Sequence, residues 1–263
     1  MMKIVNSIYR VFLVGCILML LVVPINAEEN TEASLSVSLT DNEISLLEEL
    51  SMLDPTHNDI DGEIVSVSKL IVKQEYMESL SHYSTDDMIP LGPIGTNYMT
   101  MYVTVTRLIE AGYDKFQLYS YFRWDKTPFF QLTDGIALSW SDDFTLINSS
   151  MTLYYEGLAH TGYNNLKAYL SGVSPEKGVG YAFPKLYSIP GPGITYSTSL
   201  QFGAIRAQIR KLNSSGTANV VAKYVHSKLS LSGPSFSYGN GPSIGVSIIG
   251  AHDYREVYTH WSY

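Results

Sequence analysis

The sequence of 263 residues has a single cysteine, Cys16, which lies in an apolar stretch near the N-terminus. Residues 1–27 have the pattern of a cleaved signal peptide, as described in the next paragraph. The remaining 236 residues (263 − 27) contain no cysteine and cannot form a disulfide. Such a chain depends on its own hydrophobic core, and its length is sufficient for one large domain or two small ones. Because secreted animal proteins usually carry disulfides, the absence of cysteine favours a bacterial source, and we expect a Gram-positive one.

Long apolar runs are also scarce, since none beyond residue 27 reaches the roughly 20 residues of a membrane-spanning helix. At the N-terminus, Lys3 and Arg10 flank a short polar start, and an apolar run over residues 11–24 leads to Ala27 and an acidic stretch. This pattern predicts a secretory signal peptide cleaved after Ala27, and hence an extracellular protein. The residues ending at Cys16 resemble a lipobox, but seven more apolar residues follow, which argues against lipidation.

Catalytic motifs are missing as well. The sequence has no Gly-x-Ser-x-Gly elbow, no His-Glu-x-x-His motif and no glycine-rich phosphate loop that opens a helix. We therefore expect a protein that is not an enzyme. The alternative is a glycan hydrolase, which needs two carboxyl groups, one as acid and one as base or nucleophile. Asp142, Asp143 and Glu156 are the candidates for that chemistry.

Metal ligands do not follow a familiar spacing either. His252, Asp253, Glu256 and His260 form the densest group of such residues but lack the spacing of zinc sites. Residues 57–62 are rich in oxygen ligands, but the segment begins with His and lacks the glutamate that an EF-hand needs. We expect no cofactor and no catalytic metal, and a structural calcium at residues 57–62 is the weaker alternative.

Charge is present but unevenly distributed. The net charge is −8 for the whole chain and −10 without Lys3 and Arg10, which makes a generic polyanion binder or a nucleic-acid partner unsuitable. Residues 28–63 contain eleven acids and no Lys or Arg, whereas residues 177–251 contain five Lys, two Arg and no acid. The acidic part is either a solvated tether, or a segment that folds back on the basic part, or a removable pro-segment.

Hydrophobic patterns predict an all-β protein with a short N-terminal helix. Thr40 and Glu43 have the spacing of a capping box, and an apolar stripe follows, which predicts a helix over residues 42–53. Alternating apolar residues then predict strands with one buried face, and short strands at regular spacing indicate an antiparallel sandwich or barrel. These strands are expected at residues 97–106, 116–124, 135–141 and 144–156. The β-rich domain is expected over residues 64–263, with a possible division near residue 190.

The C-terminal third predicts a long basic hairpin. Residues 194–212 form one expected strand whose apolar side changes near Gly203, which indicates a bulge, and residues 218–231 form its partner after a Ser/Gly turn. Residues 232–245 are interpreted as loop, before a last strand at 243–249. Basic and aromatic residues together suit an anionic envelope polymer or a membrane surface, although cations can simply protect an edge strand. The candidate binding residues are Arg206, Arg210, Lys211, Lys223, His226 and Lys228.

Residues 217–228 form a run that precedes a Ser/Gly-rich final strand. This run is considered together with the signal peptide and the cysteine-free chain. Together these features resemble large disulfide-free exported proteins of Gram-positive bacteria, some of which are antibacterial proteins of the bacteriocin type. The resemblance implies no catalytic residue. It favours a non-enzymatic, bacteriocin-like protein that acts at a cell envelope, with a surface- or matrix-binding protein of the producer as the alternative.

Overall fold

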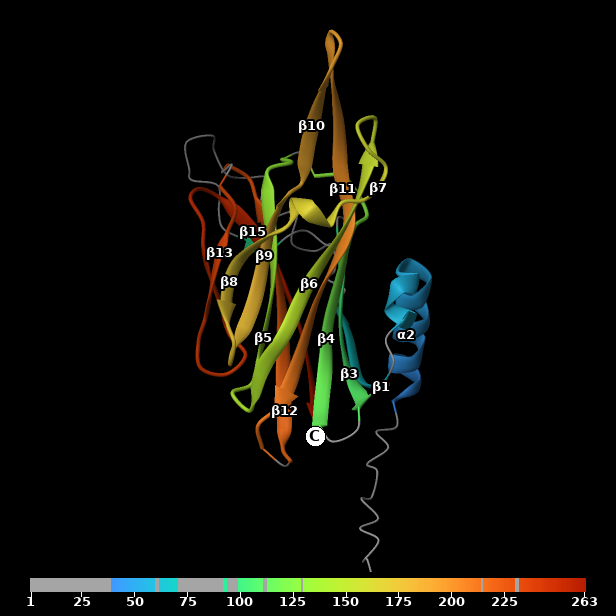
Figure 1. Cartoon of the computed structure of the whole chain (residues 1–263), viewed down its shortest axis with the longest axis vertical. Coiled ribbons are helices and arrows are strands. Elements are labelled where there is room, and N and C mark those ends of the chain that lie inside the picture. The colour runs from blue at the N-terminus through green and yellow to red at the C-terminus, as the bar shows by residue number, and fades with distance from the viewer. Residues whose placement is uncertain are drawn as a thin grey trace, which may run out of the picture. The chain divides into compact units, whose positions relative to one another are not determined.

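Figure 1 shows the computed structural model, which describes residues 39–59, 62–70, 92–93, 99–110, 113–128, 130–213, 215–229 and 232–263. All of these belong to one compact unit, Ser38–Tyr263. The predicted signal peptide and Cys16 lie outside the described residues. Within the unit, two antiparallel sheets pack face to face and a short helix precedes them, so the predicted fold class is confirmed.

Three sheets build the unit. Sheet A contains β1 (Glu63–Leu70), β3 (Met99–Glu110), β4 (Tyr113–Trp124), β11 (Ile194–Lys211), β6 (Phe144–Gly157) and β7 (Gly162–Tyr163) in that order, and β10 (Leu186–Gly191) pairs with β11. Sheet B contains β2 (Gly92–Pro93), β15 (His252–Ser262), β12 (Thr217–Ser227), β5 (Thr133–Trp140), β9 (Gly178–Pro184) and β8 (Tyr169–Ser174). The small sheet C pairs β13 (Ser235–Tyr238) with β14 (Ile244–Ser247).

The core between sheets A and B follows the predicted alternation. Ile136, Leu138 and Trp140 of β5 are fully buried, as predicted for one face of the strand. The other face of β5 is buried as well, because Ala137 packs against Phe236 and Ile244 of sheet C. Phe122 of β4 stacks on Phe183 of β9 across the two sheets, with ring centroids 5.6 Å apart. Aromatic pairs at this separation add to the burial of apolar area, so the two sheets are joined by aromatic packing.

Helix α2 (Asp41–Leu53) begins where the sequence predicts. The Thr40 side chain accepts from the backbone N–H of Glu43, and the Glu43 carboxylate accepts from the backbone N–H of Thr40, which completes the capping box. Leu50 is the one buried residue of the helix and packs against Tyr102 and Tyr119 of sheet A. The short 3-10 helix η1 (Pro55–Asp59) follows directly.

Strands β3 and β4 are buried on both faces, whereas the alternation predicted one solvated face. Tyr102, Thr104, Tyr119 and Tyr121 are buried on the face that the sequence assigned to solvent. The reason is the N-terminal segment, because Leu50 packs on three of these tyrosines. A second layer over a sheet cannot be read from the period of one strand.

Strand β11 changes its buried side as predicted. Leu200 and Ile205 are both fully buried, and the pairing with β6 shifts register between Leu200 and Phe202. The bulge therefore precedes Gly203. A Cβ at Gly203 would lie 2.6 Å from the Thr152 carbonyl oxygen of β6, so glycine is needed here for the close approach of the strands.

The predicted hairpin of residues 194–231 is wrong. Strand β11 lies between β4 and β6 in sheet A, and β12 lies between β15 and β5 in sheet B. The Ser/Gly segment that was interpreted as a hairpin turn connects the two sheets instead. Turn residues signal a change of direction, but they do not specify which strand becomes the neighbour.

Several strands, most of them short, were not predicted. Strands β7 to β10 lie between residues 162 and 191, and β15 forms in the C-terminal tail. Strand β13 also corrects the interpretation of residues 232–245 as loop, whereas β14 matches the last predicted strand. These segments are rich in Ser, Gly and Tyr, so they lack the apolar runs that mark strands. Among the residues described, no helix has the length and apolar character needed to cross a membrane.

Candidate functional site

The six basic candidates lie in two separate sheets. Arg206, Arg210 and Lys211 belong to β11 of sheet A, whereas the other three belong to β12 of sheet B or follow it directly. Arg206 lies opposite Tyr119 on the face of sheet A that carries α2, and Lys223 lies under β14 on the far side of sheet B. The prediction that these residues share one hairpin surface is wrong, and binding by each of them stays a prediction.

Two of the candidates, Lys223 and Lys228, form ion pairs with carboxylates. Lys223 Nζ lies 2.7 Å from Glu256 and donates to the Ile244 carbonyl at 2.8 Å. Lys228 Nζ lies 2.8 Å from Asp253. Burial raises the pKa of the Asp253 carboxyl, and the neighbouring Lys228 opposes this rise. These positive charges are balanced within sheet B, so they add little to its external field.

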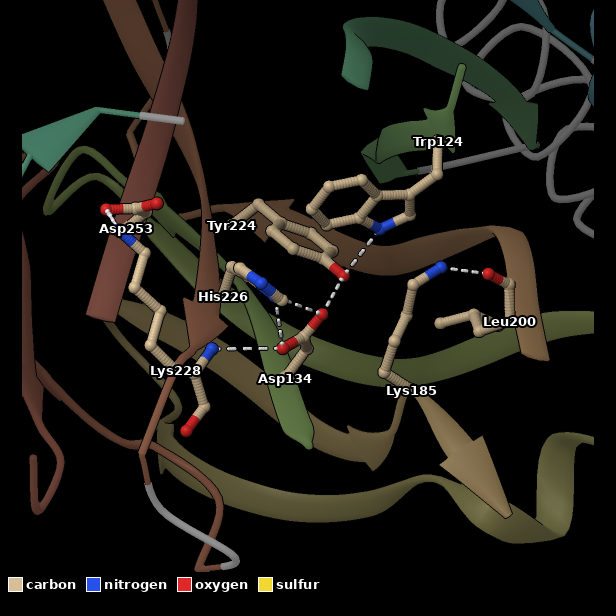
Figure 2. Close-up of polar contacts among 9 residues, drawn as sticks. Trp124, Asp134, Lys185, Leu200, Tyr224, His226, Lys228 and Asp253 are labelled. Atoms are coloured by element: carbon tan, nitrogen blue, oxygen red, sulfur yellow. Dashed lines mark hydrogen bonds and ion pairs between the residues drawn. The ribbon is translucent and has the colours of Figure 1, made fainter. Parts of the chain in front are cut away.

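His226 belongs to a buried polar network around Asp134, a fully buried residue of β5. Figure 2 shows that the Asp134 carboxylate accepts from Tyr224 Oη at 2.6 Å, from His226 Nδ1 at 2.9 Å and from the Ser227 backbone N–H at 3.0 Å. Trp124 Nε1 of sheet A donates to the same Tyr224 oxygen at 3.0 Å. The network satisfies the buried carboxylate and ties the two sheets together.

Lys185 lies beside this network and is also fully buried. Its ammonium donates to the Leu200 carbonyl and lies 4.8 Å from the centre of the Trp124 ring (Figure 2). Burial lowers the pKa of Lys185 to about 7, although the charge of Asp134 opposes this. Because the nitrogen is enclosed, we interpret Lys185 as an anchor for the base of the β10–β11 hairpin rather than as a catalytic base.

The face of sheet A that carries α2, here called the outer face, combines basic and aromatic side chains. The strand register places Lys69, Tyr102, Tyr121 and Ala204 in one row and Thr104, Tyr119 and Arg206 in the next. Tyr154 stacks on Phe202 at 4.5 Å between ring centroids, and Tyr163 meets Tyr154 edge-on. The cations of this face are Lys69, Lys115, Arg123, Arg206 and Arg210.

Residues 41–59 cover the centre of the outer face through polar contacts as well as Leu50. Asp54 accepts from Tyr119 Oη, and Arg206 donates to Thr56 Oγ1 at 2.8 Å. His57 Nε2 lies 3.1 Å from Thr104 Oγ1. Burial lowers the pKa of His57, with Asp54 opposing and Arg206 adding to this shift, which favours the neutral imidazole. The acidic segment thus contacts a basic part of the chain, as one of the sequence hypotheses expected.

The β10–β11 hairpin extends beyond the pairing of β11 with β4 and β6 (Figure 1). Its register places Ile189 opposite Tyr196 and Ile194 opposite Gly191 on one face, while Ser188 and Ser197 share a hydrogen bond on the other. The hairpin is therefore amphipathic. Ile189 is 44% exposed and Ile194 is 56% exposed.

Two neighbouring turns present further leucines. Leu158 follows Gly157, which pairs with Thr198 at the base of the hairpin, and it is 87% exposed. Leu166 in the 3-10 helix η4 (Asn165–Lys167) is 95% exposed, and the adjacent Lys167 lies over the Tyr187 ring of β10. We call Leu158, Leu166, Ile189 and Ile194 the apolar tip. Sequence reasoning missed it, although the charge-free run of residues 186–205 is visible in the sequence.

The hydrolase candidates lie at opposite ends of β6. Asp142 and Asp143 precede the strand, and Glu156 is the residue before its end. At about 3.3 Å per residue these positions are roughly 40 Å apart, far beyond the roughly 5–9.5 Å between paired glycosidase carboxyls. Asp143 instead accepts from Asn213 Nδ2 at 2.5 Å.

The metal-ligand candidates have other partners. Glu256 and Asp253 pair with lysines, as described above, and residues 60–61 of the second candidate lie outside the described part of the chain. Within the residues that the structure describes, no three His, Cys, Asp or Glu side chains gather as ligands.

No protein-family model matches the chain, and no curated protein matches it. Among solved structures, a pore-forming protein is similar at 8% identity and a TM-score of 0.36, covering 76% of this chain and 96% of its own. The membrane-inserted NetB toxin of Clostridium perfringens is similar at 9% identity and a TM-score of 0.25, covering 61% of this chain and 90% of its own. The collagen-binding domain of a Staphylococcus aureus adhesin is similar at 11% identity and a TM-score of 0.27, covering 55% of this chain and 88% of its own. Such values do not establish a common fold.

Proposed function

We propose that the protein is exported, as residues 1–27 predict, and acts without catalysis at the membrane surface of a bacterial cell. The observation that supports this function is the apolar tip. Four large aliphatic side chains lie exposed, two on the β10–β11 hairpin and two on turns near its base. Burying each of them would contribute about 1–2 kcal/mol. Antibacterial activity of the bacteriocin type is the expected outcome of such contact.

A lipid surface is favoured as the partner by the chemistry around the tip. Residues 186–205 contain no Asp, Glu, Lys or Arg, and neither do residues 157–166. Tyr187 and Tyr196 lie on the apolar face of the hairpin, and tyrosine suits the boundary between acyl chains and headgroups. A protein partner would instead be expected to meet a rim of charged and polar groups.

The length of the hairpin limits how deep it can reach. Strand β10 has six residues, whereas a membrane-crossing strand needs about 9–11. We therefore expect the tip to enter the interfacial layer and not to span the bilayer as a single hairpin. Binding by such a shallow element depends mainly on buried apolar area.

Flotation with phosphatidylcholine vesicles, with and without phosphatidylglycerol, tests this proposal. Ile194→Asp should lower the bound fraction at least tenfold. Leu212→Asp is the matched control, because Leu212 is also 56% exposed but lies at the other end of β11. Equal binding by both variants, or no binding by the unaltered protein, would refute membrane contact through the tip. Growth and dye-leakage assays on Gram-positive cells then test the antibacterial part.

A binding protein of the producer's own surface or matrix is the second candidate. The stacked Tyr154 and Phe202, with the half-exposed Tyr163, offer aromatic faces of the kind that glycans contact. Vesicle binding without any effect on growth, together with retention on purified cell walls, would favour this function over the antibacterial one.

A further inference from the structure

We propose that residues 41–59 form a releasable cap, and that the outer face of sheet A beneath it binds an anionic envelope polymer whose charged groups replace those of the cap. This function lies on a different face from the apolar tip, so it does not depend on membrane contact. The proposed polymer carries phosphate groups on a sugar or polyol chain.

The cap and the outer face are complementary in charge. Residues 41–59 contain six acids and no Lys or Arg, and five cations lie on the outer face. Glu49 of α2 lies 2.5 Å from Lys69 Nζ, at the start of the row that leads to Tyr102. The cap thus already occupies this face as an anionic ligand would.

Polar groups make a large part of the attachment of the cap. Leu50 is its one fully buried apolar side chain, whereas Ile44 is 45% exposed and Met52 is 78% exposed. Leu53 packs on the same cluster as Leu50, and the His57 ring lies against Tyr119. The polar anchors include the ion pair of Glu49 with Lys69 and the hydrogen bonds that Asp54 and Thr56 accept from Tyr119 and Arg206. A polyanion can supply acceptors to the same two donors, so it can compete for them.

Release of the cap would leave the sandwich core in place. The core residues, such as Phe122 and Phe183, pack between sheets A and B and not beneath the cap. The newly exposed surface would present the rings of Tyr102 and Tyr121 beside the guanidinium of Arg206. Aromatic faces suit the CH groups of a sugar or polyol, and guanidinium suits phosphate.

The cap can be tested in the full chain by inserting a specific protease site between Asp59 and Gly62. Cleavage followed by washing should separate residues up to 59, and the remaining protein should retain its near-UV circular dichroism. Its affinity for poly(glycerol phosphate) should then be at least tenfold higher than that of the uncut protein. Added synthetic peptide of residues 39–59 should reverse the gain, and uncharged dextran should not bind.

Point variants identify the surface. In the uncut chain Leu50→Asp should raise the affinity for poly(glycerol phosphate), whereas Met52→Asp on the same helix should not. After cleavage, Arg206→Gln should remove most of the gain. A segment that cannot be separated without loss of the native spectrum, or a separation that leaves affinity unchanged, would overturn the proposal. Vesicle flotation of the same preparations reports on the apolar tip alone, so either proposal can fail without the other.

Discussion

Lys185 offers a quantitative test of the buried network between the sheets. Its pKa falls from 10.5 to about 7 in the folded protein because the ammonium is desolvated. Between these two values the unfolded chain binds more protons than the folded chain, so the free energy of unfolding increases as pH rises from 7 toward 10.5. One pKa unit corresponds to about 1.4 kcal/mol, which gives a gain of about 2 kcal/mol between pH 7 and pH 9.

The comparison variant is Lys185→Met, which keeps the length and apolar stem of the side chain. Urea unfolding of both proteins at pH 7, 8 and 9, followed by tryptophan fluorescence, isolates the contribution of this group from all others that titrate. The unaltered protein should gain about 2 kcal/mol relative to the variant over this range. Parallel stability profiles would show that Lys185 does not lose solvation on folding, and the reasoning would be wrong.

Three further predictions concern stability. Gly203→Ala should lower the free energy of unfolding by about 1–3 kcal/mol in urea titrations, because the new Cβ meets the Thr152 carbonyl; no change would mean that the strands can separate freely. Tyr224→Phe should cost a similar amount, about 1–3 kcal/mol, since Asp134 and Trp124 each lose a hydrogen-bond partner, and a neutral result would contradict the network. Thr40→Ala should speed amide exchange in α2 while global stability changes by less than about 1 kcal/mol.

The sequence predicts the strands and the helix well where local rules decide the structure. The capping box at Thr40 and Glu43 gives the start of α2, and alternation gives the buried side of β6. Such signals arise within a few residues, so one sequence contains them. The switch of side in β11 belongs to the same class, because it appears as a change in alternation before Gly203.

Strand partners could not be predicted in the same way. Strands β11 and β12 have the alternation and the Ser/Gly connection of a hairpin, yet β11 pairs with β4, β6 and β10, and β12 pairs with β15 and β5. The choice depends on which edges are already occupied and on packing between the sheets, and both involve residues far apart in sequence. The basic candidates followed the wrong pairing, which is why Arg206 and Lys223 were placed on one surface.

The candidate site shows the same division between local and non-local information. Cations were sought because their charge is visible in the sequence, but Lys223, His226 and Lys228 meet acids that a local pattern does not reveal. The exposure of Ile189 and Ile194 depends on the extension of their hairpin beyond the paired part of β11. A charge-free run in a sequence is interpreted as part of the hydrophobic core. The structure is needed to show that no sheet packs against it.

The proposed membrane contact and the proposed polymer binding are both compatible with an acidic chain. Two of the six candidates, Lys223 and Lys228, are balanced by carboxylates, and the cap contacts Arg206, so these three side chains present little positive charge to the surroundings of the intact chain. Electrostatic attraction is therefore a weak driving force for its first contact with a membrane, and the apolar tip is the feature left to provide it. Removing the cap would add the outer-face cations without disturbing the tip. The two proposals together predict that apolar contact comes first and polymer binding second.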